Sequence, residues 1–201
     1  MMDSVLTIGH STHEFDLFSE LLLAYEVTTI ADVRSKPYSR LCSQFNREAL
    51  KAQLKKKQIT YVFLGKELGA RPEDPKCYIK GRVGYRKLAE TELFKEGLQR
   101  VVAGSKSARI ALLCAEREPL LCHRGLLIAR ELETLGVPVS HILADGRIEP
   151  HDQTVVRLLD LWKMYGDDLF RTREETVEDA YARQEQRVAY LDEDMQEEAF
   201  A

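Results

Sequence analysis

The sequence predicts a single α/β domain with a mostly parallel five-stranded sheet and helices on both faces, a Rossmann-like architecture. Short apolar runs bounded by turn residues alternate with longer segments whose apolar residues recur at helical spacing. The chain has 201 residues and is 44% hydrophobic and 31% charged, which suits one sizeable core. Strands that alternate with helices are typical of a parallel sheet joined by right-handed crossovers.

The expected strands are short runs rich in Val, Ile, Leu and Thr. They cover residues 5–8, 28–33, 59–64, 109–114 and 137–143. The expected helices are the segments in which apolar side chains recur three or four positions apart. They cover residues 15–25, 44–58, 85–102, 125–135 and 152–165.

Two segments depart from this alternation. Residues 65–84 are interrupted by Gly and Pro, and a loop of this length in a compact domain is usually functional or mobile. Beyond Gly166 the chain becomes rich in Glu, Asp, Arg and Gln. We therefore expect a domain over residues 1–166, followed by an acidic helical extension or tail over 167–201.

Composition restricts the class of protein. No apolar run approaches the length of a membrane span, and no signal-like segment begins the chain, so we expect a cytoplasmic protein without membrane contact. Four cysteines are too few for a disulfide scaffold and are expected to be reduced. The net charge of −4 argues against broad nonspecific binding to nucleic acid.

The segment 114–124 carries the densest chemistry of the chain. It contains two thiols, an imidazole, two carboxylates and two guanidiniums between an expected strand and an expected helix. The carboxyl ends of parallel strands share one edge of a sheet, where open α/β folds bind ligands. We therefore expect this segment to meet His10 and Ser11 after the first strand, and Asp32 and Arg34 after the second.

Cys122 is the better candidate for a reactive thiol. It lies near an expected helix N-terminus beside His123 and Arg124, where the helix dipole and the cations favour a thiolate. The alternative is a small buried residue in the first helical turn. Cys114 ends an apolar strand and is interpreted as a structural thiol.

Arginines near this edge predict an anion site. Its expected members are Ser11, Arg34, Arg40, Arg117, His123 and Arg124. Arginine binds phosphate or carboxylate through a planar, two-pronged contact, and a helix N-terminus adds backbone donors. The alternative is that Arg34 pairs with Asp32, and Arg124 with Glu116, for structural reasons.

Glu116 and Asp32 are candidate general bases, and His10 is a candidate acid or base. The alternative for Asp32 is to orient Arg34 or cap a helix, and for His10 to be a satisfied histidine at a strand end. Each residue taken alone favours the structural role, whereas the cluster favours the functional one.

A zinc site formed by Cys114, Cys122, His123 and His10 is a minority hypothesis. The spacing of the cysteines is not that of a short zinc knuckle, and the flanking arginines oppose a cation. We therefore predict no metal ligand from the sequence, and no cofactor is named.

Several of these features together resemble one known family. The matching segments are Thr-Ile-Gly-His-Ser at 7–11, Asp-Val-Arg at 32–34, Pro37, Ser39, Arg40, Phe45, Leu-Gly-Lys-Glu-Leu-Gly at 64–69, Leu-Cys-Ala-Glu at 113–116, Cys-His-Arg at 122–124 and His-Ile-Leu at 141–143. Over about residues 5–160 the chain resembles the DUF488 family, bacterial and archaeal proteins of uncharacterised function. The resemblance implies an α/β domain with these segments at a common edge, and it supplies no activity.

Two functional hypotheses follow. The first is an enzyme acting on an anionic substrate that bears a phosphate or a nucleotide. The second is a non-catalytic module that binds a nucleotide or nucleic acid, with structural cysteines and a role for the basic segment around Lys55. The expected partner is a small anionic ligand or nucleotide, nucleic acid is a further possibility, and the sequence predicts no oligomeric state.

Overall fold

The sheet has six strands in the order β3-β2-β6-β1-β7-β8 in the computed structural model, which describes residues 4–164 and 171–195. The strands are β1 (Val5–Gly9), β2 (Thr29–Asp32), β3 (Thr60–Phe63), β6 (Ile110–Cys114), β7 (Val139–Ile142) and β8 (Ile148–Pro150). β3, β2, β6, β1 and β7 pair in parallel, and β8 runs antiparallel to β7. The predicted α/β class and the mostly parallel sheet are confirmed.

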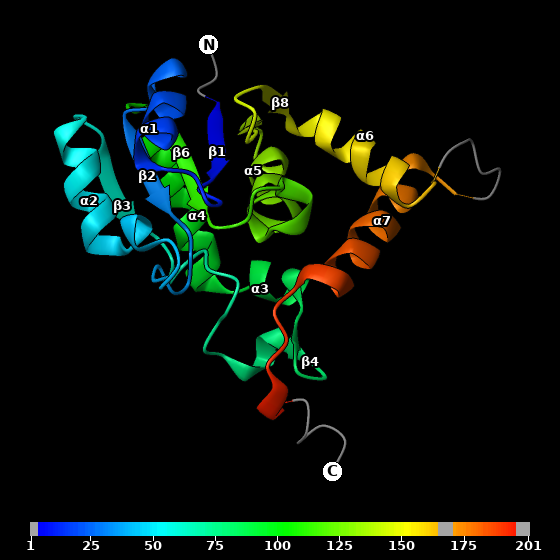
Figure 1. Cartoon of the computed structure of the whole chain (residues 1–201). Helices are drawn as coiled ribbons and strands as arrows, with labels where there is room; N and C mark the ends of the chain where they lie inside the picture. Colours follow the sequence, from blue (N-terminus) through cyan, green and yellow to red (C-terminus); the bar gives the residue numbers. More distant parts are fainter. Residues whose placement is uncertain (1–3, 165–170, 196–201) are drawn as a thin grey trace.

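Helices cover both faces of the sheet, as the sequence predicts (Figure 1). On one face, α1 (Phe15–Ala24) and α2 (Arg47–Lys56) bury Phe18, Leu22, Leu50 and Leu54. On the other face, α4 (Glu92–Ser105) and α5 (Arg130–Thr134) contribute Leu98 and Leu132 to a second buried cluster. Successive residues of a strand point to opposite faces, so Leu6 joins the first cluster and Val5 the second.

The sixth strand, β8, is a correction to the five-stranded prediction. The chain turns at Gly146, which has a φ of +84°, and returns along β7 as the edge strand of the sheet. β8 has three residues and ends in Pro150. A run this short carries no alternating pattern, and proline is tolerated only at a strand end or a sheet edge.

Two expected helices are interrupted. Residues 85–102 form α3 (Tyr85–Ala89) and α4, and the Thr91 hydroxyl accepts a hydrogen bond from the backbone N–H of Phe94 to cap α4. Residues 44–58 form a short 3-10 turn (Ser43–Phe45) and then α2, because Asn46 has an extended backbone. Apolar spacing alone does not reveal a change of helix axis when both pieces pack on the same core.

The long segment 65–84 is partly ordered into secondary structure. It contains a 3-10 turn (Pro75–Cys77) and a two-stranded hairpin of β4 (Tyr78–Ile79) and β5 (Arg82–Val83). Asp74 caps the turn by accepting from the backbone N–H of Lys76. This segment therefore has a defined path beyond the strand ends.

The helix after β6 begins in an unusual conformation. A 3-10 turn (Pro119–Leu121) leads to a π-helical segment (Arg124–Ala129), which continues as α5. π-helical turns are rare and occur frequently at functional sites. The apolar pattern predicts this helix over 125–135 but does not distinguish the π form.

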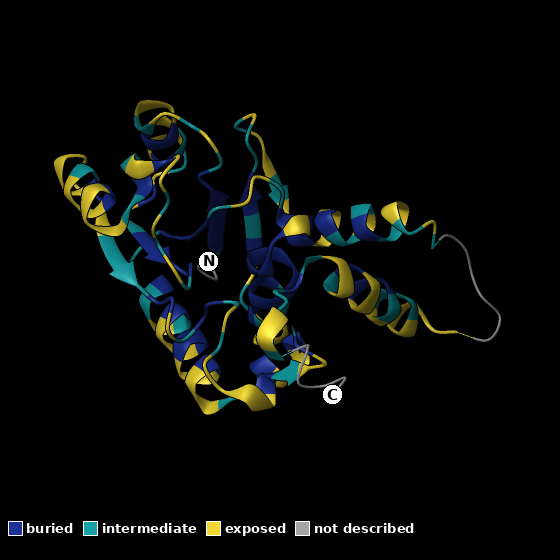
Figure 2. Ribbon diagram, turned by 60° about the horizontal axis from the view of Figure 1, so that its bottom comes forward, coloured by how far each residue is buried: buried dark blue, intermediate teal, exposed yellow. Residues whose placement is uncertain are grey.

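The segment expected to be an acidic extension includes a helix that contributes Ala180 and Tyr181 to the second buried cluster. α6 (His151–Leu161) and α7 (Arg173–Val188) lie side by side in both views (Figures 1 and 2). A reciprocal capping box between Thr172 and Glu175 begins α7, and the helix buries Ala180, Tyr181 and Gln184. The expected boundary between residues 166 and 167 lies outside the described residues.

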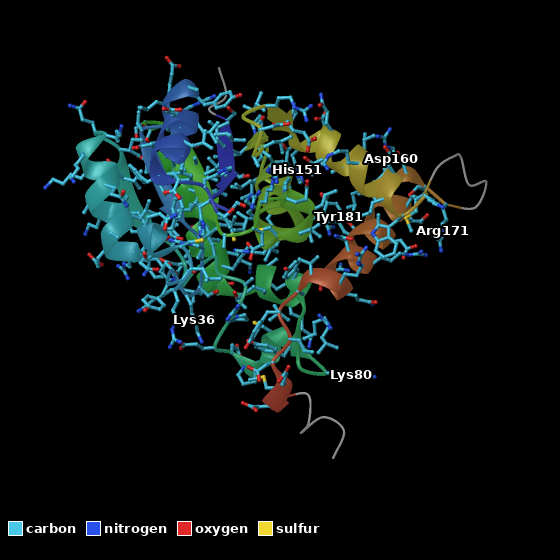
Figure 3. All side chains as sticks on the ribbon, in the orientation of Figure 1. Lys36, Lys80, His151, Asp160, Arg171 and Tyr181 are labelled. Atoms are coloured by element: carbon cyan, nitrogen blue, oxygen red, sulfur yellow. The ribbon has the colours of Figure 1, made fainter. Side chains whose placement is uncertain are left out.

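A buried chain of hydrogen bonds connects the sheet to α7. Thr7 Oγ1 lies 2.7 Å from His141 Nδ1, and His141 Nε2 lies 2.9 Å from His151 Nδ1. His151 Nε2 lies 3.0 Å from the hydroxyl of Tyr181; Figure 3 labels both residues, His151 at the start of α6 and Tyr181 on α7. Each polar atom in this chain thus has a partner inside the core.

The residues after α7 return toward the β4–β5 hairpin. The backbone N–H of Val83 donates to the carbonyl of Tyr190, and the N–H of Asp192 donates to the carbonyl of Gly81. The residues after α7 are therefore hydrogen-bonded to the β4–β5 hairpin of the segment 65–84. Among the described residues, no helix has the length and apolar character needed to cross a membrane.

Candidate functional site

The carboxyl ends of β1, β2 and β6 are adjacent in the sheet. β6 is hydrogen-bonded to β2 on one side and to β1 on the other. The helices after β1 and β2 cover one face, whereas the helical segment after β6 packs on the other face. This change of face leaves a crevice at the strand ends, the usual ligand site of open α/β sheets.

A cluster of two sulfurs, a carboxylate and an imidazole lies at the end of β6. The Cys114 thiol donates to Glu116 Oε2 at 2.8 Å, and Cys122 Sγ lies 3.2 Å from the same oxygen. His123 Nδ1 lies 3.6 Å from Cys114 Sγ and 3.7 Å from Cys122 Sγ. Glu116 is exposed to solvent although this oxygen points inward, so it connects the buried sulfurs to the surface.

Cys122 lies at the N-terminus of the π-helical segment, close to its predicted position. Its backbone is extended, with φ −145° and ψ 142°. Its carbonyl accepts from the N–H groups of Gly125 and Leu126, and its sulfur accepts from the N–H of Arg124 at 3.4 Å. The sulfur thus occupies the place of a capping side chain, where backbone N–H dipoles favour negative charge.

The surroundings shift the pKa values of the Cys114 and Cys122 thiols in opposite directions. Burial alone would raise the pKa of Cys122, but the hydrogen bond with Cys114 and the nearby Arg124 and His123 hold it well below its usual range. Burial and the neighbouring Cys122 raise the pKa of Cys114. Desolvation and then the charge of Cys122 raise the pKa of Glu116. The arrangement therefore favours one thiolate, on Cys122, beside a thiol and a carboxyl group that can carry protons.

Arg124 ties the cluster to its loop. Its side chain is fully buried, and its guanidinium donates to the carbonyls of Glu116 and, at 3.0 Å, of Arg117. The contact is with backbone oxygens, so the alternative of an ion pair with the Glu116 carboxylate is wrong. Gly9 passes directly beside this loop, where an added Cβ would meet the carbonyl of Glu116.

Asp32 and Arg34 form a buried ion pair at the end of β2. Arg34 Nε and Nη2 donate to the two carboxylate oxygens of Asp32 at 2.8 and 2.6 Å. Tyr61 donates to Asp32 at 2.7 Å, and Arg34 also donates to the carbonyl of Phe45. Burial opposes ionisation of Arg34, but the pair with Asp32 raises its pKa. The structural alternative for Arg34, pairing with Asp32, is the one that the structure contains.

His10 and Ser11 follow β1 next to this pair. The His10 ring stacks on Phe45 with centroids 4.4 Å apart, and its Nδ1 lies 2.8 Å from the carbonyl of Ser11. Burial and the charge of Arg34 lower the pKa of His10 to about 4. His10 is therefore neutral at pH 7. Ser11 has a φ of +50°, and its N–H donates to the carbonyl of Ala115.

A pocket of about 280 Å³ opens over the cluster. Its lining residues are Arg34, Ser35, Lys36, Tyr38, Ala70, Arg71, Cys114, Ala115, Glu116 and His123. Of the two clustered sulfurs, the lining includes that of Cys114 and not that of Cys122. Figure 3 labels Lys36, which follows β2 and lies beyond the strand ends.

The pocket contains some predicted site residues and omits others. Arg34, Glu116 and His123 line it, whereas Arg40 and Arg117 are exposed outside its lining. Lys36 and Arg71 are cationic lining residues that sequence reasoning missed. The available signal for Lys36 was its position two residues after Arg34. The available signal for Arg71 was its place in the long loop 65–84.

The same cluster offers ligand atoms for a metal ion. Cys114 Sγ, Cys122 Sγ and one nitrogen of His123 all lie within 4.8 Å of one another. Within the described part of the chain, His10, the fourth residue of the minority zinc hypothesis, does not belong to this group.

The fold and the cluster define an α/β protein with a sulfur, carboxylate and imidazole centre at the carboxyl edge of the parallel strands of its main sheet. A family model described as "Domain of unknown function DUF488" matches residues 14–130. The chain belongs to this family, as the motifs predict. Comparison with curated proteins and with solved structures gives no match.

Proposed function

We propose that the protein is an enzyme that acts on a small anionic substrate bearing a phosphate or a nucleotide. One observation carries the proposal: Lys36 and Arg71 line the same pocket as Cys114, Glu116 and His123. Neither cation forms an ion pair in the described part of the chain. The Arg71 guanidinium does stack over the Tyr190 ring, 4.4 Å from its centroid, but this contact leaves its charge without a carboxylate. Cations without carboxylate partners beside reactive groups suit the binding and conversion of an anion.

The residues take distinct roles in this proposal. Lys36 and Arg71 bind the anion, and Arg34, whose charge is balanced by Asp32, lines the pocket wall. Cys122 is the anionic sulfur of the reactive centre, and Glu116 carries protons between it and the pocket. Asp32 and His10 are positioning residues, because Asp32 holds Arg34 and His10 is stacked on Phe45.

A non-catalytic binding module is the second candidate. It is favoured by the burial of both thiols, since Cys114 is 3% exposed and Cys122 is 2% exposed. In this version the pocket binds a nucleotide or a nucleic-acid end, and the exposed lysines around Lys55 on α2 add contacts. Charge reversal at Lys55, Lys56 and Lys57 then abolishes nucleic-acid binding, and unchanged binding removes that version.

Anion binding is tested by thermal shift with inorganic phosphate and with ADP. We expect both to raise the melting temperature of the wild type, because a ligand that binds the native state stabilises it. The shift should be lost in Lys36→Ala and Arg71→Ala. Lys106→Ala is the matched control, since Lys106 is exposed and follows α4 at the opposite edge of the sheet. No shift with either probe contradicts the proposal.

Thiol reactivity then separates the enzyme from the binding module. With a chelator present at neutral pH, a small thiol reagent such as methyl methanethiosulfonate should modify Cys122 faster than Cys77. Cys77 is an internal control because it is also buried, and burial raises its pKa. Phosphate should slow the reaction at Cys122. Equal rates at the two cysteines would remove the catalytic role and leave the binding module.

A further inference from the structure

The ligand atoms of Cys114, Cys122 and His123 have the spacing of a tetrahedral metal site. The two sulfur-to-Nδ1 distances are 3.6 and 3.7 Å. Zinc lies about 2.3 Å from thiolate sulfur and about 2.0–2.1 Å from imidazole nitrogen, so a tetrahedral site separates these two atoms by about 3.5 Å. The two sulfurs lie within 4.8 Å of each other, whereas tetrahedral zinc separates two thiolate sulfurs by about 3.8 Å. A single ion can therefore contact all three atoms after shifts of up to about 1 Å in the cysteine side chains.

We propose that Cys114, Cys122 and His123 bind a Zn²⁺ ion whose fourth coordination position opens into the pocket lined by Lys36 and Arg71. The proposal names a cofactor for the reactive centre described above. The role given to the open coordination position rests on the proposed function. The binding of the ion itself rests only on the geometry of the three ligand residues.

Neighbouring groups already orient these ligand atoms. His123 Nε2 lies 3.2 Å from the carbonyl of Val33, which can only accept, so Nε2 carries the ring proton and Nδ1 faces the sulfurs. Histidine ligands in metal sites usually donate their other N–H to a carbonyl or carboxylate in this way. The N–H of Arg124 points at Cys122 Sγ at 3.4 Å and stabilises negative charge on that sulfur.

The sequence argues against a cation because arginines flank the cysteines, but Arg124 and Arg34 have other partners in the structure. Arg124 donates to the carbonyls of Glu116 and Arg117, and Arg34 is paired with Asp32. Two thiolates also neutralise the charge of a Zn²⁺ ion. The arginines therefore face a cluster without net positive charge, and the repulsion expected from the sequence is removed.

The position of Glu116 points to an open site. Its Oε2 contacts both sulfurs, yet it is absent from the group of mutually close ligand atoms found among the described residues. Three protein ligands and one open position are typical of catalytic zinc, whereas structural zinc has four protein ligands. At such a position zinc polarises a substrate oxygen or lowers the pKa of a bound water, and a nearby glutamate can accept the proton.

Metal content and cobalt substitution test the proposal. Full-length protein purified without added metal should contain zinc in stoichiometric amount. Co²⁺ added after removal of zinc should give thiolate-to-metal charge-transfer bands and the visible bands of a tetrahedral site. Cys122→Ser and Cys114→Ser should weaken zinc binding by more than about 100-fold, a larger loss than the 10–100-fold typical of residues that only orient a ligand. Cys77→Ser and Cys42→Ser are matched controls and should bind as the wild type does.

A second measurement on the wild type covers variants that fail to fold. Zinc should protect Cys114 and Cys122 from methyl methanethiosulfonate and leave the labelling of Cys77 unchanged. A folded wild type that binds neither zinc nor cobalt, or equal labelling of Cys122 with and without zinc, overturns the site. Zinc binding without a phosphate or ADP shift keeps the metal site and removes the proposed substrate class. A phosphate or ADP shift without metal binding keeps the proposed substrate class and removes the metal site.

Discussion

Arg34 and Asp32, two positions apart at the end of β2, are joined by two parallel hydrogen bonds of 2.8 and 2.6 Å. Both side chains are buried in the described structure. A buried pair contributes little when compared with apolar residues, but removal of one partner leaves an unpaired charge in the interior. Asp32 ends β2 and its partner Arg34 lines the pocket, so the stability of the fold and the position of this pocket residue depend on the same ion pair.

Asp32→Ala should lower the free energy of unfolding by about 3–5 kcal/mol, because Arg34 would remain buried without its partner. Urea denaturation measures the change. Asp145→Ala is the matched control: Asp145 also pairs with an arginine two positions away, but this pair is exposed. We expect the control to unfold almost as the wild type does. A small effect of Asp32→Ala would show that Arg34 is hydrated or can turn outward.

The stability of the protein should fall as pH decreases from 6.5 to 4. Burial lowers the pKa of His151 to about 4, despite the opposing charges of Asp152 and Glu149, with Arg130 also lowering it. Burial and His151 lower the pKa of His141. The unfolded chain therefore binds more protons in this interval, and stability is complete above pH 6.5. We expect a loss on the order of 2–3 kcal/mol from His151, by the usual conversion of pKa shifts.

The pH dependence is measured by urea denaturation at several pH values. His151→Gln removes one titrating ring and should flatten the profile, although it lowers stability at pH 7. His13→Gln is a control because His13 lies outside the Thr7, His141, His151 and Tyr181 chain. A profile for His151→Gln as steep as that of the wild type would assign the acid loss to other groups, among them His10.

Gln184→Ala should loosen the turn that precedes Cys122. The Gln184 amide is buried and donates to the carbonyl of Leu120 at 2.7 Å. Its loss removes this hydrogen bond from the buried carbonyl, at a cost of about 1–3 kcal/mol. Labelling of Cys122 should also become faster. Gln153→Ala on the exposed side of α6 is the control, and equal labelling in both variants would show that α7 does not restrain this turn.

Gly9→Ala should disturb the centre from the side of β1. The new Cβ would collide with the backbone carbonyl of Glu116, which Arg124 holds in place. We expect a loss of about 1–3 kcal/mol, as for other overpacked positions, and weaker cobalt bands. Gly104→Ala is the control, because its Cβ would meet only the tip of the flexible Ile110 side chain. Wild-type stability and spectra in Gly9→Ala would mean that the 115–117 loop moves freely.

The sequence predicts the elements of the sheet better than the contacts between them. Apolar runs locate the parallel strands, and Arg34, Glu116 and His123, which follow or lie near strand ends, line one pocket in the structure. The pocket cations were missed because Arg71 comes from an irregular loop, whose path depends on contacts such as the Arg71 N–H bond to Ser35 Oγ. Contacts of this kind carry no periodicity.

The same limit applies to the centre itself. The spacing of Cys114 and Cys122 along the chain argues against a shared ion, because it does not resemble a zinc knuckle. The 3-10 turn and the extended backbone of Cys122 bring the two sulfurs to one carboxylate oxygen. Sequence spacing could not reveal this, since the turn geometry depends on Pro119, Glu118 and the packing of α7.

The strand order has a consequence for how the chain is made in a cell. β1 lies between β6 and β7, so its partners begin at Ile110 and Val139. During synthesis from the N-terminus, this strand, which is buried along its whole length in the fold, cannot pair until the ribosome has passed Ile110. Until then β2 and β3 can associate only with each other and with their helices. In a nascent chain of this protein, the apolar side chains and unpaired backbone groups of β1 therefore stay exposed for several seconds at ordinary rates of translation. The nascent chain should be a good substrate for chaperones that bind at the ribosome exit.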